Sequence, residues 1–357
     1  MAQELEVQIE DNLEDGADEI TPFKYSILSY GADYTVDSLV KRLKDGNIVI
    51  PSFQRGYVWS FKDASRFIES LLLGLPVPGI FLSKEQETQK LLVIDGQQRL
   101  RTLGYFYDGT FEPTNKVFAL SSVQPRFEGA KYKSLSEEDR RRLDDSILHA
   151  TVVKQDTPSE DESSIYYIFE RLNTGGVQLK PQEIRTCIYH GEFNDVLKQL
   201  NESKSWRLIY GAVNKNMRDQ ELILRFLALY FNADGYKPPM KQFLNQYMGR
   251  NRHLKLQSRE QLSYVFLHAI DAAYNFLEAK AFKPKRALNA AVFDAVMVGI
   301  ARRLDQGEIR NCNTVRERYE SLLNDPAFIR STETGTSSED SVNTRIRLAT
   351  EALTNVE

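Results

Sequence analysis

The chain has 357 residues, of which 41% are hydrophobic and 27% are charged, and its net charge at neutral pH is −4. This composition is that of a globular protein with one or two domains, and it excludes a globally basic field that would draw nucleic acid. The two cysteines, Cys187 and Cys312, form no disulfide framework and fit a reducing compartment. No apolar run is long enough to cross a bilayer and no signal peptide is recognisable, so we expect a cytoplasmic protein without membrane contact.

The beginning of the chain differs in composition from the rest. Its first 20 residues are acidic, contain no Lys or Arg and offer little that could pack. We therefore predict a flexible acidic arm over residues 1–24.

The next part of the chain alternates short strands with helices. Helices are predicted where apolar residues recur at helical spacing, at 36–43, 61–73, 100–107 and 136–148. Ser60 and Ser136 are the expected N-caps of two of them, and Gly74 ends the helix that begins after Ser60. Strands are predicted at short apolar runs, at 47–50, 79–83, 90–94, 118–120 and 150–153. These elements predict a small α+β domain over residues 25–160.

Beyond Ser163 the pattern is almost wholly helical. Apolar positions at helical spacing predict helices at 164–172, 181–189, 219–231, 260–277, 289–304 and 341–353. We therefore predict an all-α domain over residues 161–357.

The most informative segment is Asp95-Gly96-Gln97-Gln98-Arg99, which lies between the strand at 90–94 and the helix at 100–107. A glycine turn at this point leaves backbone N–H groups and the positive end of the helix dipole facing outward, where phosphate binds readily. Arg99 and Arg101 would add positive charge, and Asp95 offers a carboxylate for a metal or a water. The alternative is an ordinary Asp-Gly turn with an Asp cap, although capping chemistry does not demand two adjacent glutamines.

Two other segments carry comparable residues. Residues 50–59 place Gln54, Arg55, Tyr57 and Trp59 after a strand, which suits stacking on a base and contact with a phosphate. The alternative there is a core-lining Tyr and Trp beside a surface Arg. Residues 171–176 form an Arg-Leu-Asn-Thr-Gly-Gly loop that either ends a helix or admits a ligand close to its glycines.

Taken together, three ordered motifs resemble the DUF262 family, over about residues 30 to 230. These are residues 51–59, the Asp95–Leu100 element, and residues 171–176 with Glu183-Ile184-Arg185. DUF262 proteins include the N-terminal domain of GmrSD-type modification-dependent restriction systems and SspE-like anti-phage proteins, and they are related in fold to ParB and sulfiredoxin. The resemblance implies a small mixed-sheet domain followed by helices.

The resemblance also implies a nucleoside triphosphate (NTP) site, with Mg²⁺, at the Asp-Gly-Gln-Gln-Arg element. Arg99 would hold phosphate, Gln97 or Gln98 would order the attacking water, and Asp95 would position a metal or the turn. The implied nucleotide-binding residues are Gln54, Arg55, Tyr57, Trp59, Gly96, Arg101, Thr102, Arg171, Asn173, Thr174, Gly175, Gly176 and Arg185.

One departure from the family pattern concerns nuclease chemistry. Many relatives continue into an HNH-type nuclease domain, which needs clustered His, Asn and Asp to hold a metal. Here the four histidines, His149, His190, His253 and His268, are scattered along the sequence. We therefore expect a separate nuclease subunit, or no nuclease at all.

Three functions remain open from the sequence. The first is NTP hydrolysis that regulates a DNA-targeting restriction or anti-phage system. The second is a ParB-like DNA-binding or nucleotide-sensing adaptor without turnover, for which Arg250, Arg252, Lys255 and Arg259 would contact DNA, although such basic runs are more often solvated helix ends. The third is a metal-dependent nuclease acting through Asp95. Self-association of the helical part is also left open.

Overall fold

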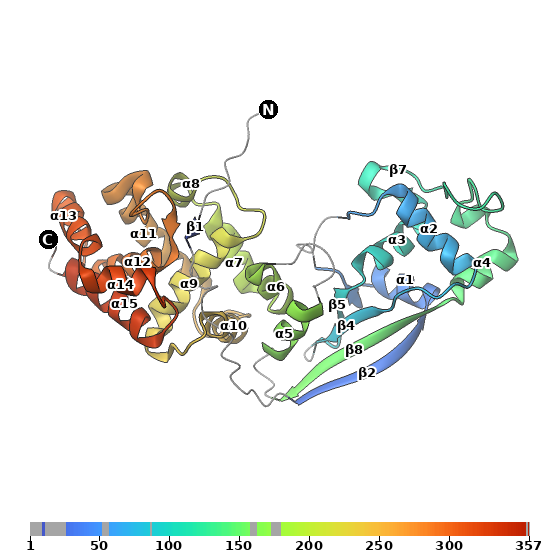
Figure 1. Cartoon of the computed structure of the whole chain (residues 1–357), viewed down its shortest axis with the longest axis horizontal. Helices are drawn as coiled ribbons and strands as arrows, with labels where there is room; N and C mark the ends of the chain where they lie inside the picture. Colours follow the sequence, from blue (N-terminus) through green and yellow to red (C-terminus); the bar gives the residue numbers. More distant parts are fainter. Residues whose placement is uncertain are drawn as a thin grey trace. The chain divides into compact units, whose positions relative to one another are not determined.

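The computed structural model describes residues 9–10, 26–51, 57–85, 88–157, 163–172, 180–354 and 356. The chain divides into two compact units, each described by itself below (Figure 1). We call residues 25–159 with 164–178 the sheet unit, and residues 179–357 with 1–24 and 160–163 the helical unit. The fold class is mixed α+β, with a sheet followed by many helices, as the sequence predicted. Apart from residues 9–10, the predicted acidic arm lies outside the described residues.

A five-stranded mixed sheet forms the centre of the sheet unit, with the strand order β2-β8-β4-β5-β3. β2 is antiparallel to β8, β4 is parallel to β8 and antiparallel to β5, and β5 is parallel to β3. The strands are β2 (Ser26–Thr35), β3 (Ile48–Val49), β4 (Ile80–Lys84), β5 (Leu91–Asp95) and β8 (Ile147–Thr157). The register pairs Phe81 with Asp95, so the end of β5 lies beside the beginning of β4.

Two helices cover one face of this sheet. Leu39 and Leu100 are buried in one cluster with strand residues that include Leu82, Val93 and Val152. Leu100 belongs to α3, so this packing fixes the amino end of α3 against the sheet, close to the end of β5. The helices of the unit are α1 (Val36–Lys44), α2 (Phe61–Leu72), α3 (Gln97–Asp108), α4 (Glu137–Asp144) and α5 (Ser163–Leu172), and a short hairpin joins β6 (Thr110–Phe111) to β7 (Lys116–Val117).

Capping explains the helix starts that the sequence predicted. Ser60 Oγ accepts a hydrogen bond from the backbone N–H of Asp63, whose side chain bonds back to Ser60, and Ser136 Oγ accepts from the N–H of Asp139. These bonds satisfy donors that the first helical turn leaves open. Gly74 follows α2 with φ +70°, a conformation that glycine adopts without strain.

Two predictions for the sheet unit were wrong, and one strand was not predicted. The helix predicted over 136–148 ends at Asp144, where two adjacent carboxylates oppose the helix dipole, and β8 begins at Ile147. The strand predicted at 118–120 is absent, and the strand pair lies just before it, at β6 and β7. The ten-residue strand β2 was missed because Leu28 and Tyr30 are exposed and show no buried alternation, while its pairing partner β8 is more than 100 residues away.

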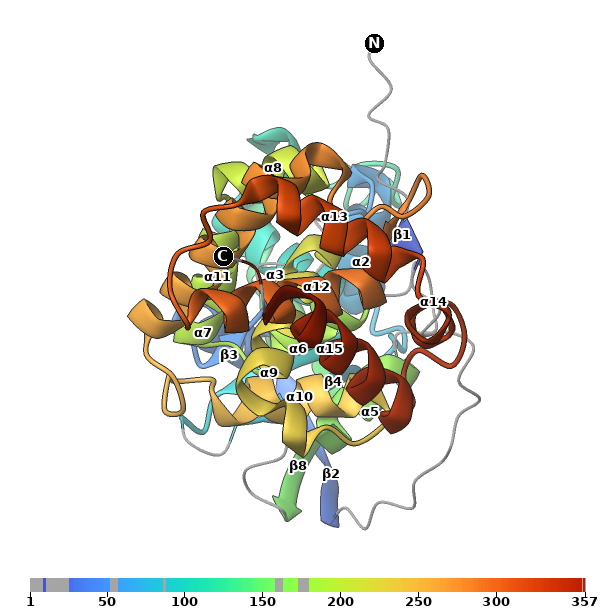
Figure 2. The same cartoon turned by 90° about the vertical axis from the view of Figure 1, so that its left-hand side faces the viewer.

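The helical unit is built around α12 (Ala290–Leu304), which packs against α9 (Arg218–Asn232), α11 (Arg259–Leu277) and α15 (Glu339–Thr354) (Figure 2). Gly299 permits the close contact of α12 with α15, since a Cβ there would lie 2.9 Å from the carbonyl oxygen of Ala349. The remaining elements are α6 (Pro181–Ile188), α7 (Glu192–Asn201), α8 (Lys204–Tyr210), α10 (Met240–Arg250), α13 (Cys312–Leu323), α14 (Pro326–Glu333) and the parallel pair β1 (Ile9–Glu10) and β9 (Leu288–Asn289).

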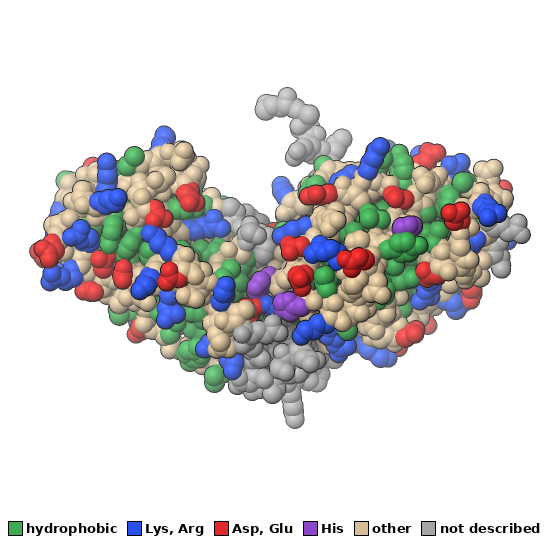
Figure 3. All heavy atoms as spheres, turned by 180° about the vertical axis from the view of Figure 1, so that it is seen from behind, with side chains coloured by type: hydrophobic (Ala, Val, Ile, Leu, Met, Phe, Trp, Pro, Cys, Tyr) green, Lys and Arg blue, Asp and Glu red, His purple; other side chains and the backbone are tan. Residues whose placement is uncertain are grey.

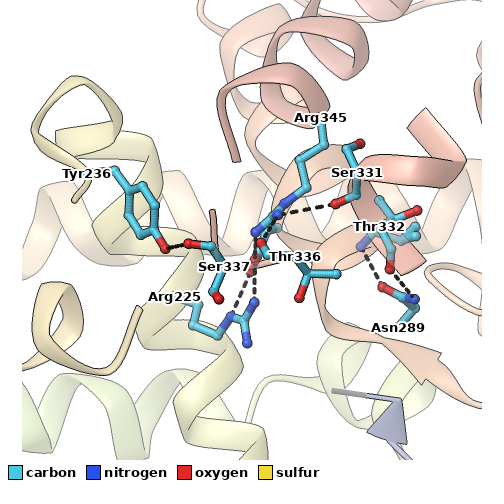
Figure 4. A network of polar contacts seen from close by, with 10 residues as sticks. Arg225, Tyr236, Asn289, Ser331, Thr332, Thr336, Ser337 and Arg345 are labelled. Carbon is cyan, nitrogen blue, oxygen red and sulfur yellow. Dashed lines mark hydrogen bonds and ion pairs between the residues drawn. The ribbon is translucent and has the colours of Figure 1, made fainter. Parts of the chain in front are cut away.

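A buried network of charges joins three of these helices (Figure 4). Asp294 accepts hydrogen bonds from Arg225 at 3.1 and 2.6 Å and from Arg345 at 3.1 Å, and all three side chains are at most 1% exposed. Arg345 also donates to the backbone carbonyls of Ser331 and Thr336, and burial lowers the pKa of its guanidinium. Because a buried charge is costly without partners, these bonds fix the arrangement of α9, α12 and α15.

Candidate functional site

The turn between β5 and α3 requires a glycine. Gly96 has φ +103°, and a Cβ at this position would lie 2.4 Å from Cγ2 of Ile80. Any other residue would therefore suffer both backbone strain and a steric clash. Sequence analysis missed the part played by Ile80, because its only signal is that it lies in a predicted strand.

No side chain caps the amino end of α3 in the described part of the chain. A helix that begins in this way leaves donors of its first turn available to solvent or to a ligand. The positive end of the helix dipole lies at the same place, so an anion there would be stabilised.

Asp95 and Arg99 lie on either side of this turn and form an ion pair. Nη2 of Arg99 is 2.7 Å from Oδ2 of Asp95, and the Asp95 side chain is 50% exposed whereas that of Arg99 is 14% exposed. Nη2 would also lie 3.4 Å from a Cβ at Gly96, so the guanidinium lies over the turn. The buried Nε of Arg99 has no hydrogen-bond partner among the described residues. The turn thus keeps an open carboxylate and a guanidinium with a donor to spare.

Gln98 connects α3 to the segment that follows Gly56. Its side-chain oxygen accepts hydrogen bonds from the backbone N–H groups of Val58, at 3.0 Å, and Trp59, at 3.4 Å. One helical turn further on, the Thr102 hydroxyl lies 2.6 Å from the Tyr57 hydroxyl. Two of the predicted nucleotide-binding residues, Tyr57 and Trp59, are therefore held directly against α3.

The rings of Tyr57 and Trp59 pack against the core. Tyr57 makes edge contacts with Tyr105 and Phe111, at ring-centroid distances of 5.2 and 5.4 Å, and Trp59 makes one with Phe67 at 5.5 Å. Burial raises the pKa of Tyr57 to about 12. These contacts correspond to the core-lining alternative considered for this segment.

The other predicted residues near the turn are distributed as follows. Gln97 and Arg101 lie half-buried in the first turns of α3, and Arg101 hydrogen-bonds to Tyr105, whose pKa is raised by burial. Arg171 is exposed in the last turn of α5. The remaining predicted residues of the unit lie outside the described residues; they are Gln54, Arg55, Asn173, Thr174, Gly175 and Gly176.

The sheet unit lies largely within a segment that matches a known protein family. Residues 36–190 match the family described as the N-terminal domain of the GmrSD restriction endonuclease. Residues 36–190 are a GmrSD-type N-terminal domain. The turn at Asp95–Arg99 and the residues held by Gln98 all lie within it.

A curated relative also matches part of the chain. The chain is 32% identical over 108 residues to the uncharacterized protein MJ0686 of Methanocaldococcus jannaschii. The match covers 23% of this chain and 18% of the relative, so the chain spans less than a fifth of that protein's length.

Arg185 lies near the end of the GmrSD-type match, in the helical unit. It is 1% exposed, and its guanidinium donates to Asn245, at 2.8 Å, to Gln182, at 3.2 Å, and to Glu221, at 2.7 Å. These bonds occupy the same donors that a phosphate would need.

The predicted DNA-binding residues lie beyond the GmrSD-type domain. Arg250 and Lys255 are exposed. Arg252 donates to the carbonyl oxygen of His190 at 2.7 Å and Arg259 donates to Gln199 at 3.3 Å, and burial lowers the pKa of Arg252. On the face drawn in Figure 3, Lys and Arg side chains are interspersed with Asp and Glu. Within the described part of the chain, Arg250 and Lys255 make no such structural contact.

Metal-binding and membrane-spanning features were also sought. Within the described ranges, no group of three or more His, Cys, Asp or Glu side chains could hold a metal ion. None of the helices in those ranges is long and apolar enough to cross a membrane.

Proposed function

We propose that the GmrSD-type domain binds an NTP at the Asp95–Arg99 turn and hydrolyses it, and that this turnover regulates a DNA-targeting restriction or anti-phage system. The observation that carries the proposal is the uncapped amino end of α3, with Arg99 lying over the glycine turn. Backbone donors, a helix dipole and a guanidinium together form a favourable site for phosphate oxygens.

In this proposal each residue of the turn has a distinct task. Arg99 holds phosphate oxygens, Gly96 lets the backbone turn sharply, and Gln97 or Gln98 orders the attacking water. Asp95 fits a role in holding Mg²⁺, because this ion is commonly bound by one or two carboxylates together with the substrate phosphates. Bound Mg²⁺ would neutralise charge on the phosphates.

The link to restriction rests on the family. The matching domain is described as part of a restriction endonuclease. The scattered histidines and the absence of a metal cluster among the described residues favour a division of labour, in which a partner subunit supplies the nuclease.

Phosphate release tests the proposal. Purified full-length protein is incubated with each NTP and Mg²⁺, and Arg99→Ala is compared with wild type. We expect Arg99→Ala to lower kcat/KM by about a hundredfold or more, the scale of losing one charged contact to the transition state. Arg141→Ala is the matched control, because Arg141 forms an exposed i,i+4 pair with Glu137, and it should leave the rate unchanged. If folded wild-type protein neither binds an NTP nor releases phosphate, the proposal is ruled out.

A DNA-binding adaptor without turnover is the second candidate, because Arg250 and Lys255 are exposed. A double variant, Arg250→Ala with Lys255→Ala, should weaken DNA binding and flatten its dependence on salt. A steep salt dependence without any hydrolysis would favour this function over the first. Absence of DNA binding at low salt would reject it.

The nuclease alternative has a separate test. Plasmid DNA that stays intact after incubation with the protein and Mg²⁺ or Mn²⁺ would reject it.

A further inference from the structure

We propose that Gln98 is a positioning residue, which fixes the segment after Gly56 on α3 and does not order the attacking water. The inference rests on the proposed function, and it separates the two neighbouring glutamines of the turn: Gln97 acts on the water, and Gln98 holds the segment of Tyr57, Val58 and Trp59.

The contacts of Gln98 are directional. Its side-chain oxygen accepts from two consecutive backbone N–H groups, those of Val58 and Trp59. An amide oxygen has two lone pairs, so these two bonds use its accepting capacity. The oxygen therefore has no lone pair left to accept a hydrogen bond from an attacking water.

A second contact lies one helical turn away on the same face of α3. The Thr102 hydroxyl is 2.7 Å from the carbonyl oxygen of Gln98, to which it donates. Its single proton is thus committed, and Tyr57 must be the donor in the 2.6 Å contact between the two hydroxyls. Residues four apart on a helix lie side by side, so Gln98 and Thr102 hold Tyr57, Val58 and Trp59 in a fixed register.

Packing and hydrogen bonding contribute differently to this attachment. The rings of Tyr57 and Trp59 pack against core aromatics. This apolar packing stabilises the attachment of the segment, but it is not directional. The hydrogen bonds to Gln98 fix the backbone itself. Gln98 therefore fixes the backbone at Val58 and Trp59, which follows directly on Tyr57.

Three variants of the full-length protein test the inference. Gln98→Glu keeps two oxygen acceptors for the backbone N–H groups, Gln98→Met keeps the approximate shape without an acceptor, and Gln97→Met is the neighbouring control. The measurements are amide hydrogen exchange over residues 57–59 without nucleotide, and kcat and KM for phosphate release.

The expected pattern differs for each variant. Gln98→Met speeds exchange at Val58 and Trp59 by about tenfold and raises KM by a similar factor, because the segment is released. Gln98→Glu keeps exchange and KM within about threefold of wild type. Gln97→Met lowers kcat and leaves exchange at 57–59 unchanged.

Two results would overturn the inference. One is a Gln98→Met variant whose amide exchange at residues 57–59 and whose KM both equal those of wild type. The other is a Gln98→Glu variant with wild-type exchange and no turnover, which would assign Gln98 to the reaction itself. If wild type releases no phosphate, the proposed function fails, and the exchange data still decide whether Gln98 holds the segment.

Discussion

The two units use the same kinds of charged side chain for opposite purposes. In the helical unit, Asp294 is fully buried and its two oxygens are occupied by two buried arginines. In the sheet unit, Asp95 is half exposed, and its partner Arg99 keeps a buried Nε without a partner among the described residues. Saturated, buried charges hold helices together, whereas an open pair at a helix end can still accept a ligand.

Arg185 shows why this comparison needs a structure. It belongs to a motif of the family resemblance, yet its guanidinium is buried and bonded to Asn245, Gln182 and Glu221. By its surroundings it resembles Arg225 and Arg345 more than it resembles Arg99. Its role in nucleotide binding stays a prediction.

The largest expected effect comes from breaking the buried network. Asp294→Asn removes the negative charge that Arg225 and Arg345 both contact in the buried network. We expect a loss of about 3–5 kcal/mol in the free energy of unfolding of the helical unit, measured by urea denaturation.

An exposed ion pair provides the matched control. Glu351 lies 2.9 Å from Arg347, with both side chains more than half exposed. Glu351→Gln should therefore change stability by less than about 1 kcal/mol. Equal effects of Asp294→Asn and Glu351→Gln would break the distinction between the buried and the exposed charges.

A smaller effect is expected at the turn. Gly96→Ala introduces backbone strain at φ +103° and a clash with Ile80. It should lower the free energy of unfolding by about 2 kcal/mol or more and reduce phosphate release at least tenfold. Gly109→Ala, at the other end of α3, has φ +78° with nothing within 4 Å of the new Cβ. It should cost about 1 kcal/mol from strain alone and leave turnover intact. Wild-type turnover in Gly96→Ala would contradict a role for this turn.

The smallest effect concerns Tyr57. Tyr57→Phe removes its hydrogen bond to Thr102 and should cost about 1 kcal/mol near neutral pH. The folded-state pKa of Tyr57 is raised to about 12 from an ordinary value of 10. The protonated form is therefore favoured by folding, and this contribution is complete below pH 10 and is lost as the pH rises toward 12.

Urea denaturation at a series of pH values tests whether the stability contributed by Tyr57 falls as the pH rises. Tyr57→Phe should lose less stability than wild type between pH 10 and 12, because the variant lacks the hydroxyl whose pKa is raised. A steeper alkaline loss in Tyr57→Phe would contradict the assignment.

Local chemistry made much of the fold predictable. Serine caps and terminal glycines gave the limits of several helices, as at Ser60 and Gly74, because these signals act within one turn. β2 could not be predicted, since it exists through pairing with a strand far along the chain and has little buried alternation. In the same way, the Asp-Gly turn could be predicted from local sequence. The close approach of Gly96 to Ile80 and the hydrogen bonds that link Gln98 to Val58 and Trp59 could not, because they depend on tertiary structure.

The most direct test of the central claim is a crystal structure of the full chain with a non-hydrolysable NTP analogue and Mg²⁺. We expect phosphate oxygens bonded to the Arg99 guanidinium and to the first backbone N–H groups of α3. A triphosphate bound elsewhere, with the Asp95–Arg99 pair unchanged and no anion at the turn, would contradict it.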